Sequence, residues 1–285
     1  MIVAEKPDED AIFKRAVTQW HKAETLRARR KNQSITFQGG RPVCIVFAAD
    51  QHFGDDGTNY PRAFEEVEIV RKTQGMYLIT VGDIVNNFVI GKLRQARDDA
   101  SIGIQEEWIL AKRYLRLCAP KLLASVAGNH DNWSKLLAGI DYFKDIVKEF
   151  APNVIYDSDD ARIMVRVGKT DWMLRIRHQW EGASIYNPTH AIERAAKWDN
   201  DFVIGVGAHT HVSGVARSFN VSGVNGLAVL CGTYKEIDPF ARKMGFPKPN
   251  TTAAVAVIFD EETHSATGFD NIAMAAKTMQ GFYRK

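Results

Sequence analysis

The chain has 285 residues, of which 45% are hydrophobic and 25% are charged, and its formal net charge is +3. These values are ordinary for a globular protein, and the small net charge does not by itself indicate a polyanionic partner. No apolar run approaches the roughly 18 residues that a membrane-spanning helix needs, which predicts no membrane partner.

Residues 1–10 are acidic and contain no apolar stretch of the kind found in a secretory signal. The three cysteines, Cys44, Cys118 and Cys231, lie in apolar contexts. An odd number of cysteines in such positions favours reduced core thiols. Together these features predict a cytoplasmic protein.

Residues 1–40 are expected to form a basic helical extension packed on a domain of residues 41–285. Residues 11–40 carry seven Lys or Arg and one Glu, a local balance of 7 − 1 = +6. Apolar side chains from Ile12 to Trp20 recur at helical spacing. The basic side is either a solvated helix face or a contact surface for a polyanion.

Predicted strands and helices alternate over the first half of the domain. Short apolar runs predict strands at 43–49, 76–81 and 121–127. Helices are predicted at 61–72, at 101–118, and from near Asn132 or Ser134 to Phe150. Proline is favoured at a first helical position, as at Pro61, and Asn or Ser at a helix cap.

The second half of the domain is mostly β. Residues 162–167 and 172–178 flank a turn and predict a hairpin, 188–197 predicts a short helix, and 202–206 predicts a strand. Three further strands, expected to complete an antiparallel run, are predicted at 226–231, 253–259 and 264–269. This order predicts an α/β fold of two packed mixed β-sheets with helices outside.

Five polar motifs occur in order along the chain, and most directly follow a predicted strand. They are Asp50-Gln51-His52, Gly82-Asp83, Gly128-Asn129-His130-Asp131, His178 and His209-Thr210-His211. On an extended segment, side chains at i and i+2 share a face, which applies to the first and last motifs. Imidazole and carboxylate groups bind divalent metals. Because two such ions can activate water for phosphoryl displacement, the set predicts a dinuclear site.

These motifs resemble those of the calcineurin-like metallophosphoesterase superfamily, whose pattern is D-x-H, G-D, G-N-H-D/E, a lone H and G-H-x-H. The resemblance covers about residues 43–232. It implies a four-layer αββα sandwich of two mixed β-sheets flanked by helices, with the metals at the strand ends between the sheets.

The resemblance also implies a role for each motif residue. One ion would be held by Asp50, His52 and His211. The other would be held by Asn129, His178 and His209. Asp83 would bridge the two ions. His130 would face the phosphate and protonate the leaving oxygen or stabilise its charge, and Asp131 would orient that imidazole. Manganese is the expected metal, with iron, zinc, nickel and magnesium as alternatives.

Two features depart from the superfamily pattern. Ala208 stands where a Gly usually precedes the first His of the last motif, and its small side chain is expected to preserve the ligand. Asn86 and Asn87 follow Gly82-Asp83 where many members have a further Asp. The G-D-x-V-D-R-G and G-N-H-E forms of the protein phosphatases do not occur in this sequence.

The connection at residues 233–250 is long and rich in Pro, Gly, basic and aromatic residues. Basic groups interleaved with aromatic rings can hold phosphates and stack bases. The candidate substrate-binding residues are Lys235, Arg242, Lys243 and Lys248. Trp180 and Tyr186 are candidates to extend that surface. An ordered surface loop anchored by its aromatic side chains is the alternative interpretation.

The sequence thus predicts a hydrolase of phosphate esters that uses a hydroxide activated by two metal ions. A phosphodiester in nucleic acid or a nucleotide is the favoured substrate. A phosphomonoesterase or protein phosphatase is the alternative. A non-catalytic scaffold of the same fold would be marked by lost ligands, and every ligand is present in this sequence. The motif style resembles that of members found in phages.

Overall fold

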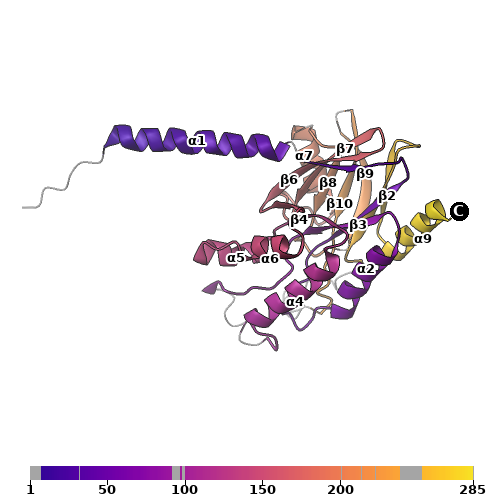
Figure 1. The fold of residues 1–285 in the computed structure, drawn as a ribbon, viewed down its shortest axis with the longest axis horizontal. Helices are drawn as coiled ribbons and strands as arrows, with labels where there is room; N and C mark the ends of the chain where they lie inside the picture. Colours follow the sequence, from indigo (N-terminus) through magenta and orange to yellow (C-terminus); the bar gives the residue numbers. More distant parts are fainter. Residues whose placement is uncertain are drawn as a thin grey trace, which may run out of the picture.

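The computed structural model describes residues 8–31, 33–91, 97, 100–199, 201–212, 214–221, 223–237 and 252–284. Within these ranges the chain forms seven helices and twelve strands. The strands make two six-stranded sheets (Figure 1).

The first sheet has a parallel centre. Its strand order is β12-β11-β2-β3-β4-β5, and its members are β12 (Ser265–Phe269), β11 (Val255–Asp260), β2 (Val43–Ala48), β3 (Met76–Val81), β4 (Leu122–Val126) and β5 (Ile155–Asp157). Strands β2 to β5 run parallel to their neighbours, whereas β11 pairs antiparallel with β2 and β12. Every residue of β2 is buried, as expected of a strand covered on both faces.

The second sheet is mixed. Its strand order is β1-β6-β7-β8-β10-β9, and its members are β1 (Gln33–Phe37), β6 (Asp160–Val167), β7 (Thr170–Arg177), β8 (Ile204–Gly207), β10 (Val224–Leu230) and β9 (Val215–Val221). Strands β6 and β7 form the expected hairpin. Strand β8 lies between β7 and β10 and is parallel to both.

The two sheets face each other across an apolar core that includes Ile45, Phe47 and Val81 from one sheet and Ile163 and Leu174 from the other. Helices cover the outer face of the first sheet: α2 (Tyr60–Lys72), α4 (Ile104–Cys118), α6 (Tyr142–Phe150) and α9 (Ile272–Tyr283). Helix α7 (His190–Asp199) covers the second sheet. The expected four-layer αββα sandwich is therefore confirmed.

Two local expectations are wrong. The single helix expected to end at Phe150 is divided into α5 (Asn129–Ala138) and α6, because Gly139 adopts a left-handed conformation with φ 70° and ends α5. Helix α5 also begins earlier than expected, directly after Gly128. The antiparallel run expected near the C-terminus is split, since β10 belongs to the second sheet and β11 and β12 to the first.

Helix α1 (Glu9–Lys31) extends away from the sheets (Figure 1). Its described side chains, residues 9–25, are exposed, and Phe13 and Trp20 retain 69% and 58% of their accessible surface. This differs from the expectation that the N-terminal extension packs on the domain, because the apolar stripe finds no cover within the described chain. None of the described helices is both long and apolar enough to cross a membrane.

Candidate metal centre

The expected ligands lie on loops that leave the carboxyl ends of neighbouring strands. Asp50 and His52 follow β2, Asp83 follows β3, Asn129 follows β4, His178 follows β7, and His209 and His211 follow β8. Because β2, β3 and β4 are parallel neighbours in one sheet and β7 and β8 in the other, these loops gather at one edge of the sandwich. The topology thus brings residues more than 150 positions apart together.

Five of these ligands have a left-handed backbone. The φ angles are 53° at Asp50, 49° at His52, 54° at Asp83, 73° at His209 and 55° at His211. In the described chain only two other non-glycine residues have positive φ. Such conformations cost about 1–3 kcal/mol each and are concentrated at functional sites. The side chains in each i, i+2 pair therefore converge through turns, and the expectation of extended segments is wrong.

One group of ligand atoms comes from Asp50, His52 and His211. The Asp50 Oδ1 atom lies 3.2 Å from His211 Nε2 and 3.5 Å from His52 Nε2. The two imidazole Nε2 atoms are 2.9 Å apart. All three atoms point into the same small volume.

A second group comes from Asp83, His178 and His209, and a third from His52, Asp83 and His130. The Asp83 Oδ2 atom lies 3.0 Å from His178 Nε2 and 3.8 Å from His130 Nε2. Asp83 and His52 each belong to two of the three groups, so the groups adjoin one another.

Hydrogen bonds fix the tautomers of two imidazoles. His52 Nδ1 lies 3.0 Å from the Asn86 Oδ1 acceptor, and His178 Nδ1 lies 2.7 Å from the Val81 carbonyl oxygen. Each Nδ1–H is therefore the donor, and in the neutral ring the Nε2 lone pair faces the carboxylates. Lone pairs that face carboxylate oxygens repel one another unless a proton or a cation lies between them.

The donor set fits metal cations. Four buried atoms have no hydrogen-bond partner in the described structure and belong to expected ligands: Asp50 Oδ1, Asp83 Oδ2, Asn129 Oδ1 and His178 Nε2. Three of them face one another or an imidazole at ion-pair distances, such as the 3.0 Å between Asp83 Oδ2 and His178 Nε2, where a cation can take the place of a proton. Nitrogen and oxygen ligands about 2.0–2.2 Å from an ion lie about 3 Å from one another, as do Asp83 Oδ2 and His178 Nε2 at 3.0 Å and Asp50 Oδ1 and His211 Nε2 at 3.2 Å.

The charges of the centre are strongly coupled. Burial alone would raise the pKa of Asp50, but the imidazoles of His211, His52 and His178 lower it well below its usual value. Burial lowers the pKa of His178, but the carboxylates of Asp83 and Asp50 outweigh it and raise the pKa to about 10. Bound cations would replace that proton, since a ligating imidazole must be neutral at the ligating nitrogen.

Two glycines allow the loops after β3 and β4 to touch. Gly82 has φ 88°, and a Cβ atom there would lie 2.5 Å from Gly128 N and 2.7 Å from His178 Nδ1. A Cβ atom on Gly128 would lie 2.0 Å from Asp83 Oδ1. A side chain at Gly82 would meet the Gly128 backbone, and one at Gly128 would meet the Asp83 carboxylate, which explains why Gly precedes Asp83 and Asn129.

His130 lies beside Asp83 with its ring held on several sides. Its Nδ1–H donates to the Asn86 carbonyl oxygen at 2.7 Å, which leaves Nε2 directed toward the centre. The ring lies 4.0 Å from the ring of Trp133 and 5.6 Å from that of Phe88, measured between centroids. Burial lowers the pKa of His130 to about 4, although the charge of Asp83 opposes the shift.

The expectation that Asp131 orients the His130 ring is not met. The Asp131 carboxylate accepts the backbone N–H groups of Asp83 at 2.8 Å, Ile84 at 3.1 Å and Gly128 at 2.9 Å. It therefore caps α5 and binds two ligand loops together. The partner of the imidazole is instead the carbonyl of Asn86, a residue that appeared in the sequence only as a departure from the family pattern.

Sequence reasoning also missed the aromatic pair beside His130. Phe88 and Trp133 are half-buried, and their ring centroids are 6.2 Å apart. The sequence contained one signal for them, since each lies within a few residues of a ligand motif.

The candidate substrate-binding residues are only partly described. Lys235 Nζ lies 2.8 Å from Asp55 Oδ2, and Lys235 pairs with Thr58 in an isolated β-bridge. Just before it, Thr233 donates its hydroxyl to the Asp50 carbonyl oxygen at 3.0 Å, so this segment adjoins the centre. Arg242, Lys243 and Lys248 lie outside the described residues.

The two other aromatic candidates differ from each other. Trp180 is 8% exposed and its Nε1–H donates to the Val206 carbonyl oxygen at 2.8 Å, so it is a core residue and not part of a binding surface. Tyr186 is 91% exposed.

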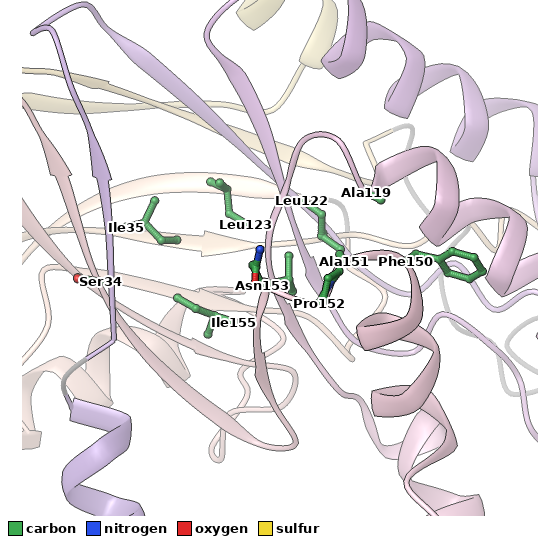
Figure 2. A pocket seen from close by; sticks show the side chains of 11 residues that line it. Ser34, Ile35, Ala119, Leu122, Leu123, Phe150, Ala151, Pro152, Asn153 and Ile155 are labelled. Carbon is green, nitrogen blue, oxygen red and sulfur yellow. The ribbon is translucent and has the colours of Figure 1, made fainter.

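An apolar hollow of about 450 Å³ lies away from this centre, between β1 and the C-terminal end of α6 (Figure 2). Ile35, Leu123 and Ile155 line it, and Ser34 and Asn153 are its polar members. It contains none of the expected site residues.

No protein-family model and no curated protein matches the sequence. Solved structures match it at low identity. The calcineurin-like phosphoesterase YfkN from Bacillus subtilis superposes with a TM-score of 0.43 and 11% identity, over 85% of this chain and 97% of that one.

Two further solved structures illustrate the range of matches. NAD nucleotidase (NadN) from Haemophilus influenzae has a TM-score of 0.42 and 8% identity, over 80% of this chain and 49% of that one. Vps29 from Chaetomium thermophilum has a TM-score of 0.36 and 11% identity, over 80% of this chain and 93% of that one. The candidate site therefore rests on the motifs and their geometry.

Proposed function

We propose that this protein is a metal-dependent phosphoesterase with two divalent cations at the carboxyl ends of the strands. The observation that supports this most strongly is that the ligand atoms of Asp50, His52 and His211, and those of Asp83, His178 and His209, lie within 4.8 Å of one another in each group. Positive-φ residues in the loops after β2, β3 and β8 place five of the proposed ligands, and such backbone conformations are concentrated at functional sites.

Each residue of the centre has a proposed role. One cation would be held by Asp50, His52 and His211, the other by Asn129, His178 and His209, with Asp83 shared. Bound there, the cations would acidify a water molecule and neutralise charge on a phosphate group. Asn86 and Val81 would orient His52 and His178 by accepting their Nδ1–H groups.

His130 is the proposed catalytic residue at the leaving group. Its Nδ1–H is committed to the Asn86 carbonyl, so Nε2 is the atom that can meet a substrate. Nε2 lies 3.8 Å from Asp83 Oδ2, next to the proposed bridge. From this position the ring, in its imidazolium form, would donate its Nε2–H to the leaving oxygen of a phosphate bound at the cations and stabilise or protonate that oxygen.

The substrate that we favour is a phosphodiester in nucleic acid or a nucleotide. Phe88 and Trp133 lie beside His130, where the group attached to the leaving oxygen would sit, and aromatic side chains stack on nucleobases. The alternative is a phosphomonoesterase or protein phosphatase. A non-catalytic scaffold is disfavoured because every expected ligand is present in the sequence.

A substrate panel tests the proposal. Metal-depleted protein would be supplied with Mn²⁺, Fe²⁺, Zn²⁺, Ni²⁺ or Mg²⁺ and assayed on bis(4-nitrophenyl) phosphate, 4-nitrophenyl phosphate, cyclic nucleotides and single- and double-stranded DNA. We expect Mn²⁺ to raise the unfolding temperature and to support diester hydrolysis above monoester hydrolysis. Binding of two ions without hydrolysis of any substrate would favour the scaffold.

A further inference from the structure

A buried carboxylate on α4 lies behind the catalytic centre and has no part in the proposed ligand set. Glu107 is 2% exposed, and its Oε2 accepts the backbone N–H of Asn87 at 2.6 Å. Burying a carboxylate costs free energy that an apolar residue at the same position would avoid. Its presence behind the loop that follows β3 therefore calls for an explanation.

The group that Glu107 binds is one end of a single peptide unit. The Asn87 N–H and the Asn86 C=O belong to the same planar peptide, in which they point in opposite directions. The C=O end accepts the Nδ1–H of His130 at 2.7 Å. Glu107, the 86–87 peptide and the imidazole thus form one chain of hydrogen bonds.

We propose that Glu107 is the positioning carboxylate of His130 and acts through the peptide group that joins Asn86 and Asn87. A carboxylate at the N–H end fixes the plane of the peptide and polarises its carbonyl, since hydrogen bonds in a chain strengthen one another. The polarised carbonyl holds the ring by Nδ1 and leaves Nε2 directed at the substrate. This is the task that the sequence assigned to Asp131.

The side chain of Asn87 reinforces the arrangement. Asn87 is fully buried with φ 47°, its Nδ2 donates to the His130 carbonyl oxygen at 2.6 Å, and its Oδ1 accepts the Ser134 hydroxyl at 2.9 Å. The strained residue is therefore tied to the first turn of α5 on one side and to Glu107 on the other.

Glu107 itself has little freedom to move. A Cβ atom on Gly54 would lie 2.3 Å from Glu107 Cγ, so the absence of a side chain at position 54 makes room for the carboxylate. Gly54 has φ 106° and follows His52 by two residues. The Glu107 side chain thus lies between the turn after β2 and the peptide group that joins Asn86 and Asn87.

The catalytic part of this inference rests on the proposed function, and leaving-group dependence tests it. In Glu107→Leu the peptide loses its acceptor, whereas in Glu107→Gln an amide oxygen retains it without the charge. We expect the Leu variant to lose about 10–100-fold in kcat/KM on a phosphodiester with an alkoxide leaving group. On a nitrophenolate leaving group, which needs little help from His130, the loss should be severalfold at most, and both metal ions should remain bound.

Glu107→Gln should show a smaller loss in kcat/KM, confined to the alkoxide substrate. If the Leu variant does not fold, the Gln variant alone tests the proposal. Glu106 provides the matched control, because it is exposed on the same helix and also accepts a backbone N–H, that of Gly103 at 2.9 Å. Glu106→Gln and Glu106→Leu should leave both rates unchanged. Equal losses on the two leaving groups, or no loss in either Glu107 variant, would overturn the proposal.

A second readout does not need an active enzyme. The Nδ1–H proton of His130, assigned by its disappearance in His130→Ala, should give a slowly exchanging downfield NMR signal in the wild-type protein. We expect Glu107→Leu to abolish or shift it and the Glu106 variants to leave it in place. An unmoved signal in Glu107→Leu would refute the hydrogen-bond chain, whereas a moved signal in a protein inactive on every substrate would refute only the proposed function.

Discussion

The backbone N–H of His130 donates to Asp83 Oδ1 at 2.9 Å, so the proposed catalytic imidazole is anchored to the proposed bridging carboxylate. The two oxygens of Asp83 have different environments, because Oδ2 has no hydrogen-bond partner in the described structure and faces His178 Nε2 at 3.0 Å. One oxygen therefore fixes the position of His130 while the other remains available for cations. This division lets metal binding and the placement of His130 be tested separately.

Asp83→Asn should weaken both metal sites at once. The amide oxygen can retain the bond from the His130 N–H, which turns the amide nitrogen, a poor ligand, toward the cations. Metal analysis by mass spectrometry should find two ions in loaded wild-type protein and a loss at both sites in the variant. Asp171→Asn is the control, since Asp171 pairs with Arg166 on the surface. A single ion in fully loaded wild-type protein would refute the dinuclear centre.

His130→Ala should keep both ions and lose about 10²–10⁴-fold in rate. The ring nitrogens of His130 are used by Asn86 and, in our proposal, by the leaving oxygen, so its removal takes no ligand from the cations. The loss should be larger for an alkoxide than for a nitrophenolate leaving group, which steady-state rates on paired substrates would measure. Equal losses on both would argue against a role at the leaving group.

The sequence contains local signals for the strands and for the ligand motifs, because an apolar run and a motif are both read from adjacent residues. The left-handed conformations at Asp50, His52 and Asp83 have no such signal, since positive φ is uncommon for any single non-glycine residue, even for Asp and His, which adopt it more often than most. Their geometry comes from the crossing of loops from different strands. Sequence reasoning therefore identified residues that the loops bring close together, but it did not identify the backbone conformations that orient them.

The hydrogen bonds that hold the His130 ring show a second limit of prediction from sequence. Asp131 is adjacent in sequence to His130, which made it the natural candidate to orient the ring. Glu107 is 20 residues from Asn87, and only the packing of α4 against the loop after β3 brings the two together. A contact made through tertiary packing leaves no local pattern in a single sequence.

Gly82→Ala should destabilise the protein by at least about 1–3 kcal/mol. The residue has φ 88°, and the added Cβ would lie 2.5 Å from the Gly128 nitrogen, where backbone on both sides cannot yield. Urea unfolding of metal-free protein would measure the change in free energy. Gly281→Ala is the matched control: nothing lies within 4 Å of a Cβ there, so this substitution in α9 should be neutral or stabilising. Equal stability of Gly82→Ala and wild type would contradict the close contact of the two loops.

Glu107→Gln should gain stability relative to wild type as the pH rises from about 4.5 to about 7. Burial raises the pKa of Glu107 from 4.5 to about 7, with the charge of Asp55 adding to the shift and the Asn87 N–H opposing it. The folded state thus binds a proton that the unfolded state has released, so wild-type stability falls across that window, by up to about 3 kcal/mol. The neutral amide escapes this loss. Urea unfolding of both proteins at pH 5 and pH 8, with a chelator present, would measure it, and a pH-independent difference would contradict the shifted pKa.

Neutralising the basic residues of the 233–250 segment tests the preference for nucleic acid. If Lys235, Arg242, Lys243 and Lys248 contact a polyanion, their replacement by Gln should raise KM for DNA and flatten its salt dependence, because fewer counterions are released on binding. Lys235 pairs with Asp55 at 2.8 Å, so Lys235→Gln alone separates its contribution from that of the other three.

A small chromogenic diester provides the control substrate for these variants, because it reaches only the metal centre and has no further phosphates for the segment to bind. Its kcat/KM should stay within about twofold of wild type while KM for DNA rises, and initial rates across a range of salt concentrations would show both effects. Equal losses on the two substrates would mean that the segment shapes the centre, as the contact of Thr233 with Asp50 would allow. No change on either substrate would leave an ordered surface loop as the better interpretation and remove one support for a nucleic-acid substrate.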